Sequence, residues 1–204
     1  MGQAVSPAGF AMPEYRRKLP HFHPENTYLF LTWRLWGSLP AKPVTTVYAT
    51  PGRAFVAQDR LLHHGANGPK WLPNSQVADV VAETLRMGEV ERHFYELLAW
   101  VVMPDHVHLL ILPLVPIPQI MRWVKGSSAR AANRILSRTG QPFWQDESYD
   151  HDLRRSEQIS RTIAYIEENP VSAGLAATAK SWRWSGAGWQ AKPPAPPNQS
   201  DRPQ

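Results

Sequence analysis

Residues 95–112 read YELLAWVVMPDHVHLLIL, and this stretch decides the fold. Two runs of apolar and β-forming residues, 95–103 and 106–112, are separated only by Pro104 and Asp105. So short a connection between two such runs is typical of a β-hairpin, whose strands pair antiparallel. The sequence therefore predicts an antiparallel sheet that contains this hairpin.

Three other segments carry apolar side chains on one face at the helical period, which predicts amphipathic helices. These segments are residues 75–92, 117–138 and 156–169. Asn74 or Ser75 can cap the first helix, and Gly88 is a weak position within it. The apolar stripe of the second helix includes Ala131. Pro170 lacks a backbone N–H, so we expect it to close the third helix.

Two aromatic segments complete the elements that the sequence predicts. Residues 28–35 are rich in aromatic and β-forming side chains and are bounded by polar, Gly and Pro positions, as a buried strand should be. Residues 182–185 form a last, short aromatic element. Because strands and helices do not alternate regularly, we expect an α+β fold in which helices pack on an antiparallel sheet.

The chain has 204 residues and no cysteine. This length predicts one domain, residues 14–190, between a flexible N-terminal tail (1–13) and a Pro-rich disordered C-terminal tail (191–204). Without cysteine, a metal would have to be held by histidine, carboxylate or amide oxygen. No apolar run approaches the roughly 18–20 residues of a membrane span. We therefore expect a soluble, cytoplasmic protein without a membrane partner.

A net charge of +5 and nine tryptophans favour a polyanionic partner, nucleic acid in particular. Residues 117–139 contain five basic residues and no acidic one, whereas the rest of the chain has 17 of each sign. The five are Arg122, Lys125, Arg130, Arg134 and Arg138. Their spacing predicts a basic stripe opposite the apolar face, beside the small Gly126, that follows DNA phosphates. The alternative is a solvated helix face.

His106 and His108 are the sharpest candidates for chemistry. Residues two apart in a strand project from the same face, about 7 Å apart at Cα, so the two imidazoles could hold one cation. The pattern also arises by chance, and His21 and His23 repeat it in a polar stretch that has no apolar strand to aim the rings.

Tyr165 and Asn169 form a second candidate. Residues four apart share a helix face, so these two side chains and Arg161 line one polar ridge. The alternative is that Tyr165 packs at the edge of the core with its hydroxyl in water, and that Asn169 only terminates the helix.

Several segments, in this order, resemble the REP-associated tyrosine transposases, a branch of the single-tyrosine HUH superfamily. They are HFHPE (21–25), TWRL (32–35), VMPDHVHLL (102–110), KG (125–126), FWQDESYDH (143–151), YIEENPVSAGL (165–175) and WRW (182–184). Together they run through most of the predicted domain, and as an ordered set they are far more specific than any one of them.

The resemblance implies a ferredoxin-like or RRM-like sheet and activity on single-stranded DNA that contains a hairpin resembling a repetitive extragenic palindrome. It implies that His106, His108 and Asn169 bind the metal and that Tyr165 is the nucleophile. Nitrogen and oxygen ligands without thiolate suit Mg²⁺ or Mn²⁺. The implied reaction is metal-dependent cleavage and strand transfer through a 5′-phosphotyrosine link. The sequence leaves open whether a monomer or a homodimer acts.

Two rival functions also fit the sequence: a catalytically idle protein that binds DNA hairpins, and a metallonuclease that hydrolyses DNA without a covalent link. Arg161 is expected either to contact a phosphate near Tyr165 or to pair with Glu157. A polar group further along could orient the site, or supply ligands if Asn169 does not; it comprises Glu147, Asp150, His151 and Asp152. Tyr149 is a spare phenol that the resemblance leaves non-catalytic.

Overall fold

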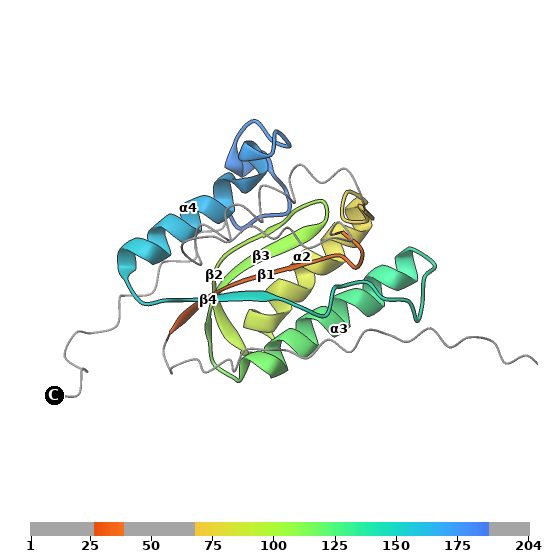
Figure 1. Ribbon diagram of the computed structural model, residues 1–204, viewed down its shortest axis with the longest axis horizontal. Helices are drawn as coiled ribbons and strands as arrows, with labels where there is room; N and C mark the ends of the chain where they lie inside the picture. Colours follow the sequence, from red (N-terminus) through yellow and green to blue (C-terminus); the bar gives the residue numbers. More distant parts are fainter. Residues whose placement is uncertain (1–26, 39–67, 188–204) are drawn as a thin grey trace, which may run out of the picture.

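The computed structural model describes residues 27–38 and 68–187 (Figure 1). The elements follow the order β1 (Tyr28–Arg34), α2 (Ser75–Val90), β2 (Tyr95–Val102), β3 (His106–Pro113), α3 (Ile117–Ile135), β4 (Tyr149–Leu153), α4 (Ser156–Ser172) and the short 3₁₀ helix η1 (Ala179–Ser181). The predicted tails lie outside the described residues, as does the pair His21 and His23. The domain limits at 14 and 190 therefore stay a prediction.

The four strands form one sheet in the order β2-β3-β1-β4, and every neighbouring pair is antiparallel. The predicted hairpin is confirmed as β2 and β3. β1 lies between β3 and β4, so the chain must cross from β1 past β3 to reach β2. A β-α-β-β-α-β succession with this order is the ferredoxin-like arrangement. The expected α+β fold, with helices on an antiparallel sheet, is confirmed.

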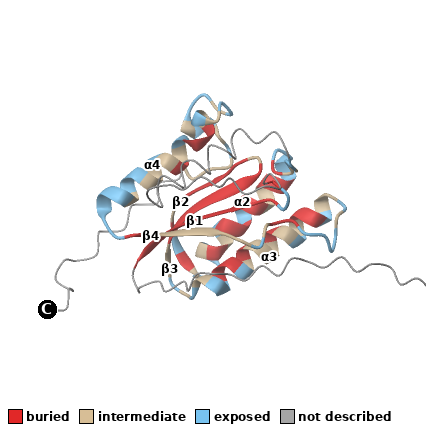
Figure 2. Cartoon of the chain, viewed as in Figure 1, coloured by how far each residue is buried: buried red, intermediate tan, exposed pale blue. Residues whose placement is uncertain are grey.

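The helices lie on opposite faces of the sheet (Figure 1). Helices α2 and α3 pack on one face, where they enclose the larger apolar core together with strand residues such as Trp33 and Leu109. Helix α4 packs on the other face, over a smaller apolar cluster that includes Phe30, Leu110 and Ile166. Figure 2 shows the central strands buried and the N-terminal part of α4 exposed.

Helix α2 begins where the sequence predicted, and Asn74 is its cap. The Asn74 side chain accepts hydrogen bonds from the backbone N–H groups of Gln76 and Val77. Gly88 has a packing role there: a Cβ at this position would collide with the ring and hydroxyl of Tyr95, whose O–H donates to the carbonyl of Leu85 at 2.6 Å. Gly88, which weakens α2, thus allows Tyr95 of β2 to pack closely against this helix.

Helices α3 and α4 end differently from the prediction. Helix α3 stops at Ile135, three residues early, because Ser137 takes a positive φ of 55°. Ala132, not Ala131, is the buried alanine of its apolar face. Helix α4 continues through Pro170 to Ser172. Pro170 lies in the last turn, where the missing N–H costs a single helical hydrogen bond and the ring is buried.

The predicted aromatic segment after η1 lies along the edge of β2. Val102 N–H donates to the carbonyl of Trp184 at 2.8 Å, and Gly186 N–H donates to the carbonyl of Trp100 at 2.9 Å. Ser185 pairs with Val101 as an isolated bridge. This segment therefore covers part of an edge that would otherwise expose unpaired backbone groups.

None of the described helices is long and apolar enough to cross a lipid bilayer.

Candidate active site

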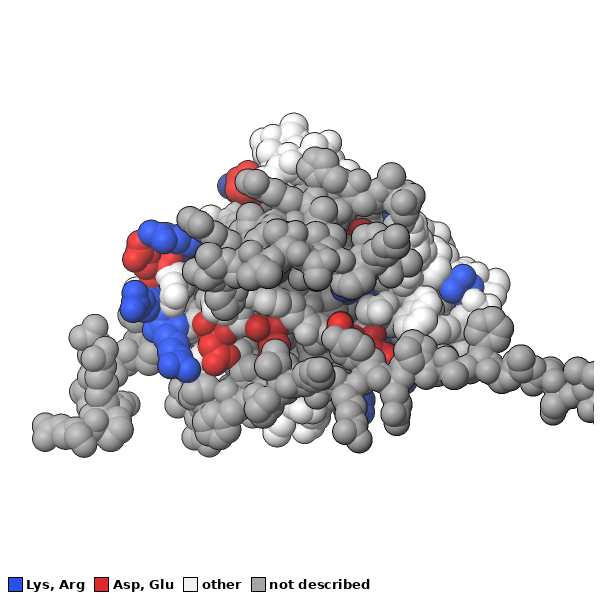
Figure 3. Space-filling model, in the orientation of Figure 1, with Lys and Arg blue, Asp and Glu red and all other residues white. Residues whose placement is uncertain are grey.

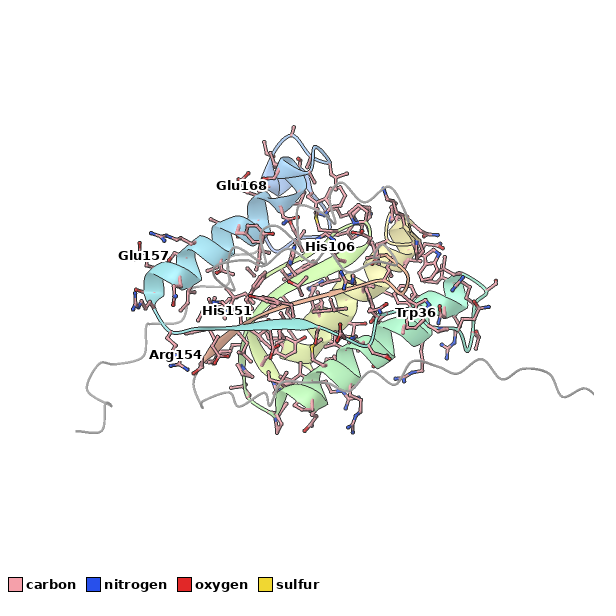
Figure 4. All side chains as sticks on the ribbon, in the orientation of Figure 1. Trp36, His106, His151, Arg154, Glu157 and Glu168 are labelled. Atoms are coloured by element: carbon pink, nitrogen blue, oxygen red, sulfur yellow. The ribbon has the colours of Figure 1, made fainter. Side chains whose placement is uncertain are left out.

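The two histidines of β3 lie side by side on the face of the sheet that carries α4. The Nε2 atoms of His106 and His108 are 3.1 Å apart, and the two rings are 1% and 0% exposed. His106 lies at the end of the strand, next to the Pro104-Asp105 turn (Figure 4). The prediction that both rings share a face is confirmed, and the intervening Val107 belongs to the core on the opposite face.

Each histidine is oriented through its other ring nitrogen. Oδ1 of Asp105 lies 2.7 Å from Nδ1 of His106, and Oγ1 of Thr32 lies 2.8 Å from Nδ1 of His108. A carboxylate only accepts hydrogen bonds, so it holds the proton of His106 on Nδ1 and leaves the Nε2 lone pair available. Contacts of this kind fix the ring orientation of histidines that bind metals.

The donor set fits a divalent cation. Two atoms at right angles, each about 2.1 Å from one ion, would lie about 3.0 Å apart, which is close to the Nε2 separation. Among the described residues no three His, Cys, Asp or Glu side chains gather into a metal site. A third protein ligand from the described part of the chain would therefore be a group of another kind, such as an amide oxygen.

Helix α4 places the predicted nucleophile beside His108. The rings of Tyr165 and His108 have centroids 5.7 Å apart, and Phe30 packs edge-on against Tyr165 while stacking on His108. Asn169, one turn further along the helix, is 2% exposed and therefore faces the protein interior. The apolar side of α4, which includes Ile166, holds this helix against the sheet.

Comparison with known proteins relates this region to one family of transposases. Residues 71–169, from just before α2 to Asn169, match the family described as IS200-like transposases. Through this segment the chain is similar to IS200-like transposases. The matched segment contains His106, His108, Tyr165 and Asn169. No curated protein matches the chain.

Two solved structures are similar to this chain. One is a REP-associated tyrosine transposase bound to a REP hairpin, with 19% identity, a TM-score of 0.48, and coverage of 86% of this chain and 82% of that one. The other is a candidate transposase from Deinococcus radiodurans R1, with 22% identity, a TM-score of 0.41, and coverage of 76% and 98%.

The other polar side chains predicted for the site lie on α4 and on or just before β4. Arg161 is exposed on α4 and forms an ion pair with Glu157, one of its two predicted alternatives. Basic and acidic side chains alternate at this end of α4 (Figure 3).

The polar group on and before β4 divides between the two faces of the sheet: Asp150 and Asp152 pair with Leu31 and Leu29, whose side chains belong to the core on the face opposite the histidines. Asp150, His151 and Asp152 belong to β4, and His151 lies opposite Phe30 in the strand register. Glu147 precedes β4, where its backbone carbonyl lies near the Nζ of Lys125. Burial, and then the charge of Asp150, raise the pKa of the Tyr149 phenol above its ordinary value.

The predicted basic stripe lies on α3, and thus across the sheet from the histidines (Figure 1). Arg122, Arg130 and Arg134 are exposed. Lys125 donates to the carbonyl of Asp146 at 2.9 Å, and it lines, with Arg122 and Gly126, a hollow of about 770 Å³ between α3 and residues 141–147.

Arg138, the last residue of the predicted stripe, packs against Trp71. The guanidinium of Arg138 lies over Trp71, with its carbon 4.1 Å from the ring centroid, and its Nε is buried without a hydrogen-bond partner among the described residues. Arg138 therefore stabilises the fold through a cation–π contact rather than facing solvent.

Three residues of the site escaped the sequence analysis: Thr32, Arg34 and Asp105. Thr32 and Arg34 alternate along β1, so their shared face was predictable, but only the pairing of β1 with β3 places them beside the histidines. Burial lowers the pKa of the Arg34 guanidinium, and the charges of Glu147 and Asp105 act in the opposite direction.

Proposed function

We propose that this protein is a metal-dependent endonuclease and strand transferase for single-stranded DNA that contains a hairpin of the REP type. The observation that carries the proposal is the meeting of His106 Nε2 and His108 Nε2 beside Tyr165, within a segment of the IS200-like transposase family. The order of motifs shared with the REP-associated tyrosine transposases supports the hairpin as the substrate.

His106, His108 and the amide oxygen of Asn169 would hold one divalent ion, with Mg²⁺ or Mn²⁺ suited to these ligands. When bound, the ion supplies Lewis-acid polarisation of a phosphate oxygen and offsets the negative charge that develops there. Asp105 and Thr32 would keep both Nε2 atoms turned toward it. The protein's own contribution is thus a rigid, buried pair of ligands.

Tyr165 would supply the nucleophile. Its phenolic oxygen attacks the phosphorus, the bond from phosphorus to the 3′-oxygen breaks, and the DNA keeps a 5′-phosphotyrosine link to the protein. The phenolic proton is lost, and the leaving 3′-oxygen gains one and departs as a hydroxyl. Because the link conserves the phosphodiester bond, a second 3′-hydroxyl can reverse the step and join strands without ATP.

The test is denaturing electrophoresis of the protein incubated with a labelled single-stranded hairpin and Mn²⁺ or Mg²⁺. We expect a DNA–protein adduct that is absent with EDTA and absent in Tyr165→Phe. Tyr149→Phe is the matched control, since it removes a nearby phenol of the same sheet face and should leave the adduct intact. His106→Ala should bind the hairpin without cleaving it.

Each rival function predicts a different outcome. Cleavage that survives in Tyr165→Phe would show hydrolysis without a covalent link. Binding of the hairpin by the wild-type protein, with neither cleavage nor adduct in either metal, would show an idle binding protein. Cleavage by His106→Ala at the wild-type rate would contradict the metal site.

A further inference from the structure

Arg34 is a buried cation beside the candidate active site. It is the last residue of β1, is 9% exposed, and pairs with His106 across the strand register. Its side chain leaves the sheet on the same face as Thr32 and both histidines, because Trp33 and Leu35, its neighbours in sequence, belong to the core on the other face. Arg34 therefore lies in the same row of the sheet as a predicted metal ligand.

The backbone around Arg34 is held on both sides. Leu35 N–H donates to the carbonyl of Asp105 at 2.7 Å, and Gln145 N–H donates to the carbonyl of Arg34 at 2.9 Å. The position of the Arg34 side chain thus follows from the sheet and from the two segments that border it, rather than from a loop.

The N–H groups of the Arg34 guanidinium are available as hydrogen-bond donors. Within residues 27–38 and 68–187, it makes no hydrogen bond and no salt bridge to another side chain. The nearest opposing charges, Asp105 and Glu147, act on it only at longer range, and Asp105 is already bonded to His106. A buried charge without a direct partner is costly, and an arginine side chain in a protein does not relieve that cost by losing its proton.

We propose that Arg34 binds a non-bridging oxygen of the phosphate that Tyr165 attacks, an inference that rests on the proposed function. The planar guanidinium presents donors in a fork that matches two oxygens of a phosphodiester, and burial strengthens such contacts. The charge that develops on the phosphate during attack would be stabilised by a cation already in place.

Other cations are worse placed for this role. Arg161 is exposed and paired with Glu157, and the basic residues of α3 lie across the sheet. Among the described arginines and lysines, Arg34 is the one that combines burial with a register position opposite a site histidine. A purely structural role would use Arg34 only to balance Asp105 and Glu147, and would not involve DNA.

The experiment measures the single-turnover rate of adduct formation by the full chain in Mn²⁺. The substrates are a normal hairpin and the two diastereomers of a scissile methylphosphonate, each of which replaces one non-bridging oxygen by methyl. We expect Arg34→Met to slow the adduct by about 100- to 1,000-fold on the normal substrate. Arg34→Lys keeps the charge without the fork, so an intermediate rate is expected. Arg154→Met, a substitution of an exposed arginine, is the matched control.

The diastereomers separate contact from structure. For the wild-type protein, the diastereomer that removes the contacted oxygen should react more slowly than the normal substrate. This difference in rate between the normal substrate and the diastereomer should be smaller in Arg34→Met. If Arg34→Met does not fold, the same comparison is made with Arg34→Lys. If both diastereomers slow Arg34→Met as much as they slow the wild type, or if Arg34→Met forms the adduct at the wild-type rate, Arg34 does not contact the phosphate. Either result would leave the proposed function standing. Absence of any adduct from the wild-type protein would overturn the proposed function and this inference with it.

Discussion

The two faces of the sheet differ although the same strands build both. On β3, Val107, Leu109 and Ile111 face α2 and α3, and His106 and His108 alternate with them toward α4. On β3 the first face is apolar from end to end. The second is apolar around Phe30 and Leu110 but polar at one end, where Thr32, Arg34 and the histidines are all buried.

Within β3, the side chains on one face therefore stabilise the fold, and the histidines on the other face belong to the candidate active site. Burying an apolar side chain stabilises the fold by roughly 1.5–3 kcal/mol, whereas burying a polar group is unfavourable unless a partner satisfies it. The second face meets that requirement at His106 and His108, whose Nδ1 atoms both have partners. Substitutions that distinguish the two faces should therefore distinguish folding from function.

The largest expected effect comes from Leu109→Ala and Leu110→Ala, a matched pair of fully buried leucines that face opposite ways. Each should lower the free energy of unfolding by about 2–5 kcal/mol, through lost burial and a residual cavity. Only Leu110→Ala should also slow adduct formation per folded molecule, because Leu110 shares a cluster with Phe30 and Tyr165. Urea unfolding and the adduct assay test both points. Equal slowing by the two variants would remove the functional distinction between the faces.

A smaller effect is expected from Thr32→Val, which removes the hydroxyl at Nδ1 of His108 and keeps the shape of the side chain. The affinity for Mn²⁺, measured by isothermal titration calorimetry, should fall by about 10- to 100-fold. Thr32→Ser is the control, since it restores the hydroxyl and should restore the affinity. If Thr32→Val binds Mn²⁺ as tightly as the wild type, the hydroxyl does not orient the ligand.

Tyr95→Phe probes a polar group on the apolar face. It removes the hydrogen bond to the carbonyl of Leu85 and should cost about 1 kcal/mol of stability at pH 7. Burial, followed by the charge of Glu89, raises the pKa of the Tyr95 phenol above its ordinary value of about 10. The unfolded chain therefore ionises first, so this tyrosine's contribution to stability is complete below about pH 10 and is lost as the pH rises further.

The measurement for Tyr95 is urea unfolding at neutral and alkaline pH. The difference in unfolding free energy between the wild type and Tyr95→Phe should narrow above about pH 10. A constant difference between pH 7 and 11 would mean that the phenol ionises equally in the folded and unfolded chains.

The smallest effect is expected from Arg130→Ala combined with Arg134→Ala on α3. If these exposed side chains contact phosphates, the slope of log affinity against log salt should decrease in size by about 1.4 on single-stranded DNA or about 1.8 on the duplex stem. Fluorescence anisotropy with a labelled hairpin measures the slope. An unchanged slope would show that the stripe, which lies across the sheet from the histidines, only faces solvent.

Local periodicity is sufficient to predict much of the fold and part of the site. The hairpin, the first strand and the three helices follow from side-chain spacing, as does the shared face of His106 and His108. The helix end at Pro170 was wrong because a proline in the last turn removes one hydrogen bond, and burial of its ring offsets that loss. Tertiary packing can thus extend a helix past a proline when the proline removes only one hydrogen bond.

By itself, the sequence determined the elements, the α+β class and the two pairs His106 with His108 and Tyr165 with Asn169, because each pair depends only on the period of one strand or one helix. Only the tertiary structure decided that Tyr165 lies beside His108, that Thr32 and Arg34 pair with the two histidines across β1 and β3, and that the basic stripe lies on the opposite side of the sheet. Those relations depend on strand order and on which face each helix covers. Both are set by contacts between residues far apart in the chain, which no local spacing encodes.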